Sequence, residues 1–110
     1  MTRPIVVWTW PTPNGHKVHI ALDELGLPYV AKPVNIGAME QLKPEFLALT
    51  PNHRIPAIMD PDGPDGVPLT LFKSGAILIY LAEKPGAEKA GRLIPADPVQ
   101  RPTCLQWLMF

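Results

Sequence analysis

The sequence predicts one α/β domain whose strands and helices follow the order βαβαββα. Three observations carry this prediction: short β-branched apolar runs bounded by prolines, helical spacing of apolar residues between two of them, and a Gly/Asp-rich turn between two others. A helix between the first two strands favours parallel pairing, and the turn between the last two favours an antiparallel hairpin. The four strands together therefore predict a mixed four-stranded sheet.

The first half of the chain is predicted to form the βαβ unit. Residues 5–8 (IVVW) are typical of a buried strand, and residues 29–34 predict the second strand. Gly26 and Pro28 end the helix between them. Four apolar residues of that helix recur at the spacing of one helix face: Val18, Ala21, Leu22 and Leu25.

The second half begins with a short helix over residues 44–49 and continues with two strands, 55–59 and 67–72. A helix over residues 74–83 follows, with Ser74 as its expected N-cap. This helix is apolar nearly all round, which predicts that more than one of its faces is covered.

The last segment contains a helix opening at Asp97-Pro98 and an apolar pattern that continues to Phe110. Leu105, Leu108 and Met109 have helical spacing, but no partner for them follows in the chain. The alternatives are a frayed terminal helix and a piece of a longer protein, and we interpret the chain as a fragment.

Composition excludes several classes of protein. With 46% hydrophobic residues, the 110-residue chain can bury a core and is not disordered. Its 10 basic and 10 acidic residues balance, which argues against nucleic-acid or anionic-membrane partners. No apolar stretch approaches the roughly 20 residues that a bilayer needs. The lone Cys104 allows neither an internal disulfide nor a CxxC motif, so a cytoplasmic domain is expected.

Three short segments could carry chemistry, and each has a structural alternative. Thr12 and Asn14 lie where the first strand leads into the first helix, where they could stabilise a thiolate, although Asn14 could simply be the N-cap. The hydroxyl of Ser74 could bind a carboxylate or only cap its helix. Ile55-Pro56 is a candidate cis peptide that would expose the Ile55 backbone to a peptide-like ligand, or an ordinary proline that opens a strand.

His16 and His19 stand three residues apart on the first helix, which is a possible spacing for a metal pair. No carboxylate or cysteine completes a ligand set, so surface histidines and no metal are expected.

Several motifs occur in the order found in one protein family. With the tail over residues 105–109, they resemble the N-terminal thioredoxin-like domain of bacterial glutathione transferases, nearest to the Nu class of glutathione-dependent disulfide-bond reductases. The motifs are Thr12-Pro13-Asn14-Gly15-His16-Lys17, Pro44-Glu45-Phe46, Pro51–Ile58, Ser74-Gly75-Ala76-Ile77 and Tyr80–Lys84.

The resemblance implies a domain organisation and an assembly. It places the thioredoxin-like, glutathione-binding domain at residues 1–86, a linker at 87–98, and the first helix of a truncated all-helical C-terminal domain at 99–110. Glutathione would be the cosubstrate, a small electrophile or a disulfide the second substrate, and a homodimer the assembly of the full-length protein. The 110-residue chain alone would be weakly active or inactive.

The resemblance also implies residue roles. Thr12 and Asn14 would hydrogen-bond the glutathione sulfur. Gln41 would contact the glycyl end, with Arg54 beside it. Ile55, ahead of the family's cis-proline Pro56, would pair with the cysteinyl backbone, and Ser74 would hold the γ-glutamyl carboxylate.

Lys73 departs from the family pattern, which has an acidic residue immediately before the serine to pair with the γ-glutamyl ammonium. A lysine there replaces attraction with repulsion. The alternative function is therefore a non-catalytic dimerisation or interaction module that has lost glutathione affinity. A free-standing thioredoxin or glutaredoxin is disfavoured, because no cysteine lies near the first helix.

Overall fold

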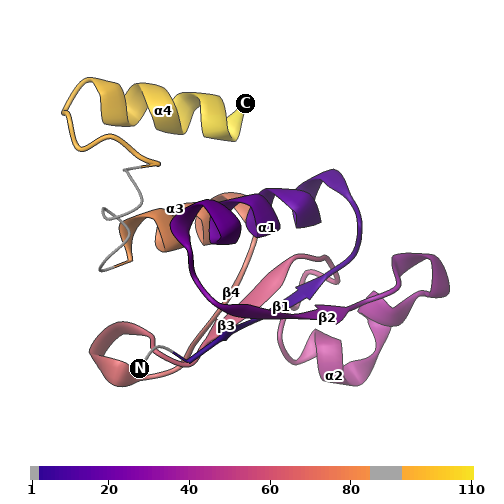
Figure 1. Cartoon of the computed structure of the whole chain (residues 1–110). Coiled ribbons are helices and arrows are strands. Elements are labelled where there is room, and N and C mark those ends of the chain that lie inside the picture. Colours follow the sequence, from indigo (N-terminus) through magenta and orange to yellow (C-terminus); the bar gives the residue numbers. More distant parts are fainter. Residues whose placement is uncertain (1–2, 85–92) are drawn as a thin grey trace.

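A four-stranded mixed sheet forms the centre of the molecule (Figure 1). The computed structural model describes residues 3–84 and 93–110. β1 pairs parallel with β2 and antiparallel with β3, and β3 pairs antiparallel with β4, which gives the order β2-β1-β3-β4. The predicted βαβ unit, hairpin and mixed sheet are confirmed. The strands are β1 (Ile5–Thr9), β2 (Tyr29–Pro33), β3 (Ala57–Asp60) and β4 (Leu69–Phe72).

Helices cover both faces of this sheet. In Figure 1, α1 (Pro13–Leu25) and α3 (Ser74–Glu83) lie together on one face, and α2 (Pro44–Leu47) lies on the other. The loops also contain three short 3-10 turns that periodicity does not predict, because three residues are too few to establish a pattern. These turns are η1 (Ile36–Ala38), η2 (Glu40–Leu42) and η3 (Pro64–Gly66).

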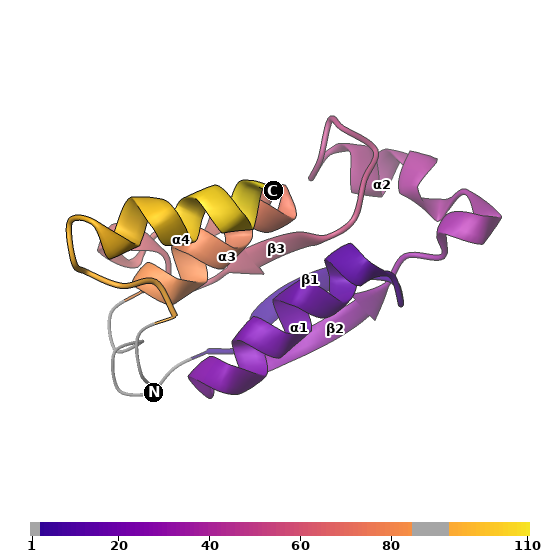
Figure 2. The same ribbon diagram turned by 90° about the horizontal axis from the view of Figure 1, so that it is seen from above.

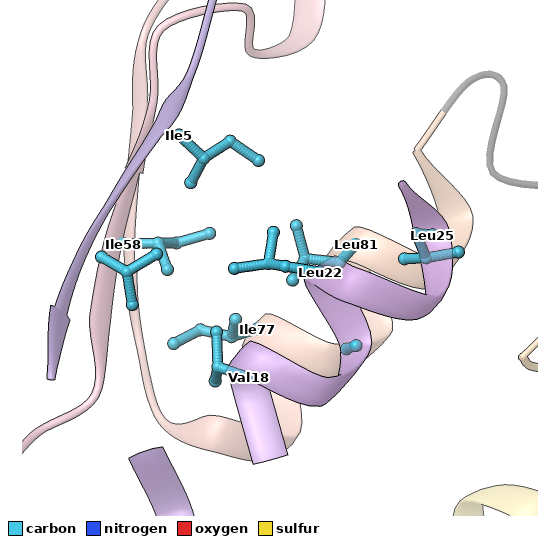
Figure 3. Close-up of a cluster of buried hydrophobic side chains, with 9 residues drawn as sticks. Ile5, Val18, Leu22, Leu25, Ile58, Ile77 and Leu81 are labelled. Carbon is cyan, nitrogen blue, oxygen red and sulfur yellow. The ribbon is translucent and has the colours of Figure 1, made fainter. Parts of the chain in front are cut away.

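The main core lies between the sheet and the α1/α3 pair (Figure 3). Side chains alternate along β1, so Ile5 and Val7 face this core while Trp8 packs against a smaller cluster around Phe46 under α2. Full burial of each large aliphatic side chain contributes roughly 1.5–3 kcal/mol. The residues labelled in the close-up are Ile5, Val18, Leu22, Leu25, Ile58, Ile77 and Leu81.

The last helix, α4 (Gln100–Met109), lies along the outer side of α3 (Figure 2). Arg101 donates to Glu83 at 3.0 Å near one end, and the Met109 sulfur lies 4.0 Å from where a Cβ on Gly75 would be at the other. The two helices are therefore antiparallel neighbours. No residue of α4 is buried, and Trp107 is 64% exposed.

The predicted helix at the end of the chain is thus present. Its assignment to a second domain remains a prediction. The proposed boundary after Gly86, and the linker residues up to position 92, lie outside the described residues. Within the described ranges, no helix has the length and apolarity needed to cross a membrane.

A buried carboxylate, Asp60, joins the end of β3 to α3. Its Oδ2 accepts hydrogen bonds from the Tyr80 hydroxyl and the Lys84 ammonium, both at 2.6 Å, and its Oδ1 accepts the Asp62 backbone N–H at 2.9 Å. Burial pushes the Asp60 pKa upward, but these hydrogen bonds and the Lys84 charge outweigh it and hold the pKa below its ordinary value. Asp62 in turn pairs with Arg3 at 2.8 Å, which ties the N-terminal segment to the same corner.

Candidate functional site

A groove runs along the sheet edge where β1 ends, β3 begins and β4 ends. The cross-strand pairs Trp8–Ala57 and Ala57–Phe72 bring these three strand ends side by side. The groove consists of two adjoining hollows of about 570 and about 140 Å³. Four residues line both: Asn14, Asn52, Arg54 and Ile55.

All eight residues singled out from the sequence line this groove. Thr12 and Gln41 border the larger hollow, while Pro56, Lys73 and Ser74 border the smaller one. The remaining three, Asn14, Arg54 and Ile55, are shared. The structure therefore brings together residues that are up to 62 positions apart in the chain (12 to 74).

Thr12 caps the N-terminus of α1, and the expectation that Asn14 is the cap is wrong. Thr12 is extended, and its Oγ1 accepts the Gly15 N–H at 3.2 Å. Asn14 instead lies inside the first turn, after Pro13 at the first helical position. Proline suits that position because its missing N–H would have no helical partner there.

Thr12 and Asn14 can both act as hydrogen-bond donors toward the groove. The Thr12 hydroxyl oxygen is engaged as an acceptor, which leaves its proton to donate elsewhere. The Asn14 Oδ1 accepts from Lys17 Nζ at 3.1 Å, so the amide NH₂ remains as the donor end. Neither donor has an acceptor among residues 3–84 and 93–110, and two such donors beside the positive end of a 13-residue helix are suited to an anion.

Gly15 allows the β1–α1 connection to pack this tightly. A Cβ at this position would lie 2.4 Å from the Trp10 carbonyl oxygen and 2.7 Å from Thr9 Oγ1. Any side chain would therefore displace the loop that carries Thr12.

Ser74 is the first residue of α3, and the expectation that it caps the helix is wrong. The N-cap position belongs to Lys73, whose side chain makes no capping hydrogen bond. Lys73 alone connects β4 to α3, and its φ of 75° lies in the left-handed region where non-glycine residues are uncommon. The uncapped first turn leaves backbone N–H groups beside the Ser74 hydroxyl as donors at the groove.

The Ile55–Pro56 bond is cis, as the family resemblance implied. Gln41, on η2, lines the larger hollow together with Ile55, and its buried Oε1 has no hydrogen-bond partner among the described residues.

Sequence reasoning missed Asn52, which lines both hollows. The Pro51-Asn52 step indicates a turn and gives no hint of which way it faces. It also missed the apolar wall of the larger hollow, because that wall comes from η1, η2 and the residue between them. Those wall residues are Ile36, Met39 and Leu42.

Of the two histidines of α1, which were both expected to be surface groups, only His16 is one. His16 is exposed, but His19 is half-buried, with Nε2 3.0 Å from Thr9 Oγ1 and its ring 5.5 Å from that of Tyr29. His19 thus packs against residues of β1 and β2. Helix spacing alone could not reveal this, because it does not show which strands a side chain reaches. Among the described residues, no three His, Cys, Asp or Glu side chains are grouped as metal ligands.

Cys104 lies on α4, with its sulfur 3.9 Å from the Leu93 carbonyl oxygen. The chain has no other cysteine, and none lines the groove. These 110 residues therefore place no thiol of their own in the groove.

Comparisons with known proteins agree with this architecture. Residues 12–84 match the model of the glutathione S-transferase N-terminal domain. The chain is 46% identical over 101 residues to the disulfide-bond oxidoreductase YfcG of Escherichia coli. The aligned region covers 91% of this chain and 45% of YfcG. The chain thus spans less than half the length of this relative.

Two solved structures have the same fold. A glutathione transferase from Pseudomonas putida, with one glutathione disulfide bound per subunit, superposes with a TM-score of 0.87 at 53% identity, covering 97% of this chain and 44% of that one. One from Burkholderia graminis, with two glutathione molecules bound per subunit, gives 0.86 at 53% identity, covering 97% and 42%.

The βαβαββα order, the mixed sheet and the extent of the family match lead to one assignment. The chain has the thioredoxin-like fold and belongs to the glutathione S-transferase N-terminal domain family, close to the bacterial disulfide-bond oxidoreductases.

Proposed function

We propose that the groove binds glutathione and stabilises its thiolate for attack on a disulfide or an electrophile. The observation that carries this proposal concerns Thr12 and Asn14 at the N-terminus of α1. Each side-chain oxygen already accepts a hydrogen bond, whereas the hydroxyl proton and the amide NH₂ have no acceptor in the described part of the chain. Donors and a positive helix end favour the thiolate over the thiol and so lower the pKa of a bound thiol.

The other groove residues divide the rest of the ligand between them. Ser74 and the uncapped first turn of α3 hold one carboxylate, and Arg54 attracts the other. The backbone of Ile55, ahead of Pro56, pairs with the cysteinyl unit. Gln41, which lines the larger hollow, contacts the glycyl end.

The proposed reaction is thiol–disulfide exchange. The glutathione thiolate attacks one sulfur of a substrate disulfide, which forms a mixed disulfide and releases the other sulfur as a thiolate. A second glutathione thiolate then attacks the mixed disulfide at the glutathione sulfur. This step yields glutathione disulfide and frees the second substrate thiolate, so two electrons pass from two glutathione molecules to the substrate.

Relatives support this choice of reaction. YfcG is a disulfide-bond oxidoreductase, and the two solved structures hold glutathione disulfide or two glutathione molecules per subunit. The activity of a whole protein containing this domain, its homodimeric assembly and its cytoplasmic location are parts of the same proposal.

The test is the thiol pKa of bound glutathione, followed by the ultraviolet absorbance of the thiolate as pH varies. Thr12→Val combined with Asn14→Ala should raise this pKa toward that of free glutathione, since both donors are gone. Thr12→Ser is the matched control, because it keeps the hydroxyl and should keep the low pKa. An unchanged pKa in the double variant would remove these residues from the proposed role.

A second candidate, a non-catalytic interaction module, is favoured by one observation, Lys73 in the groove. If Lys73 had disabled the site, the chain would bind no glutathione and Lys73→Glu would restore binding. A chain that already binds glutathione with Lys73 in place is not such a module by this argument.

A further inference from the structure

The charged residues that line the groove are basic. Its lining residues include two cationic ones, Arg54 and Lys73, and the Lys17 ammonium donates to the lining residue Asn14 at 3.1 Å. None of the described residues that line either hollow is an aspartate or a glutamate.

This asymmetry belongs to the groove and not to the chain as a whole. The complete sequence has 10 basic and 10 acidic residues. Another hollow of about 570 Å³, under α2, is lined by both signs in equal number: Lys32, Lys43, Glu40 and Glu45. A ligand in the groove therefore meets cations without a compensating carboxylate.

Backbone geometry keeps one of these cations beside the anion-binding end. Lys73 is a single-residue connection between Phe72 and Ser74, and its φ of 75° is fixed by the strand before it and the helix after it. Any carboxylate held by Ser74 and the first turn of α3 lies next to this residue. A cationic group on the same ligand carbon would lie next to it as well.

Glutathione carries such a group. At neutral pH its γ-glutamyl end bears a carboxylate and an ammonium on one carbon, and its glycyl end bears a second carboxylate. The carboxylates suit the groove, whereas the ammonium meets Lys73 with no acidic partner among the lining residues.

We propose that this groove prefers a thiol peptide with two carboxylates and no ammonium, such as a glutathione whose amino group is missing or acylated. The inference rests on the proposed function, because it concerns the ligand of the same groove. Repulsion between like charges at a solvent-exposed site is weakened by screening, so we expect roughly a fivefold to tenfold difference in affinity, which is about 1 kcal/mol.

The experiment compares glutathione with glutaryl-cysteinylglycine, which has the same skeleton and both carboxylates but lacks the amino group. Isothermal titration of the 110-residue chain at neutral pH and low salt should give a dissociation constant roughly fivefold to tenfold lower for the amine-free peptide. The ratio should shrink as salt is added, because the effect is electrostatic. N-acetylglutathione serves as the second probe and should share the preference.

Lys73→Glu should reverse the order of the two ligands, since a carboxylate would then face the ammonium. Lys73→Gln should bring the ratio close to one. Both substitutions keep a non-glycine residue at the same positive φ, so they isolate the charge. Lys32→Glu is the control, because it makes the same charge change in the hollow under α2 and should leave the ratio unchanged.

Two outcomes would overturn the inference in different ways. Glutathione binding as tightly as the amine-free peptide, or more tightly, would refute the preference while the proposed function stands. Binding of neither peptide by a folded chain would refute the proposed function, and the inference with it.

Discussion

Lys84 is the cation that offsets the buried charge of Asp60, and its removal should be costly. The Asp60 side chain is 1% exposed and that of Lys84 11%, and their charged atoms lie 2.6 Å apart. Breaking a buried pair by removing one partner typically costs about 3–5 kcal/mol, because the remaining charge is uncompensated. Tyr80 and the Asp62 N–H still contact the carboxylate in Lys84→Met, so we expect the low end, about 3 kcal/mol.

Urea unfolding followed by circular dichroism measures this loss, and thermal unfolding should show it as well. About 3 kcal/mol corresponds to a fall of roughly 12 °C in Tm, at about 4 °C per kcal/mol for a domain of this size. Lys43→Met is the matched control. It removes a lysine from a pair with Glu40 that is 3.7 Å apart and half exposed, and it should cost less than about 1 kcal/mol.

The difference in stability between the parent chain and Lys84→Met should also change with pH in a definite direction. In the parent chain the Asp60 pKa lies below its unfolded value, so its contribution to stability is present above the unfolded pKa and is lost as pH falls toward the folded one. Without Lys84 the folded pKa moves upward, and protonation then relieves the buried charge. The gap between the two proteins should therefore narrow from pH 7 to pH 4. A gap of less than 1 kcal/mol at pH 7, or one that widens on acidification, would refute the reasoning.

Three further predictions concern packing and hydrogen bonding, and urea unfolding measures each of them. Tyr80→Phe should cost about 1.5 kcal/mol, as a hydrogen bond of 2.6 Å to the buried carboxylate is lost, and no change would mean that this bond contributes nothing. Leu22→Ala should cost about 3 kcal/mol through the cavity it leaves in the main core, whereas Ile20→Ala on the exposed side of α1 should cost far less, and equal losses would contradict the assigned core. Gly15→Ala should cost about 2 kcal/mol or more, since its Cβ would lie 2.4 Å from the Trp10 carbonyl oxygen, and a stabilised variant would show that the loop is not packed as described.

Periodicity and turn residues predicted the framework of this fold well. The apolar run of β1, the helical spacing of α1 and the turn before β4 each specify an element by themselves, and their order limits how the strands pair. The prediction failed where a single residue decides between neighbouring positions. Both Thr12 and Asn14 are good N-caps by type, and the structure places Thr12 there, with Pro13 at the first helical position.

The sequence predicted which residues line the candidate site better than it predicted how the loops form its walls. Motif resemblance selected eight residues, and all of them line one groove, seven near the ends of paired strands and Gln41 on the η2 turn. The contribution of Asn52 and of the η1–η2 wall could not be predicted, because it depends on how irregular loops fold over the sheet edge. The charge imbalance around Lys73 also appears only when the lining residues are known, since the complete sequence is balanced.

The proposed function requires that the groove binds a thiol peptide and stabilises its thiolate. Isothermal titration of the 110-residue chain with reduced glutathione, repeated with the Thr12→Val/Asn14→Ala variant, measures this binding. We expect a dissociation constant in the micromolar to low-millimolar range for the parent chain, and weaker binding by the variant at a pH where the bound thiol is ionised. A folded parent chain that releases no heat with glutathione or with its amine-free analogue would refute the proposed function.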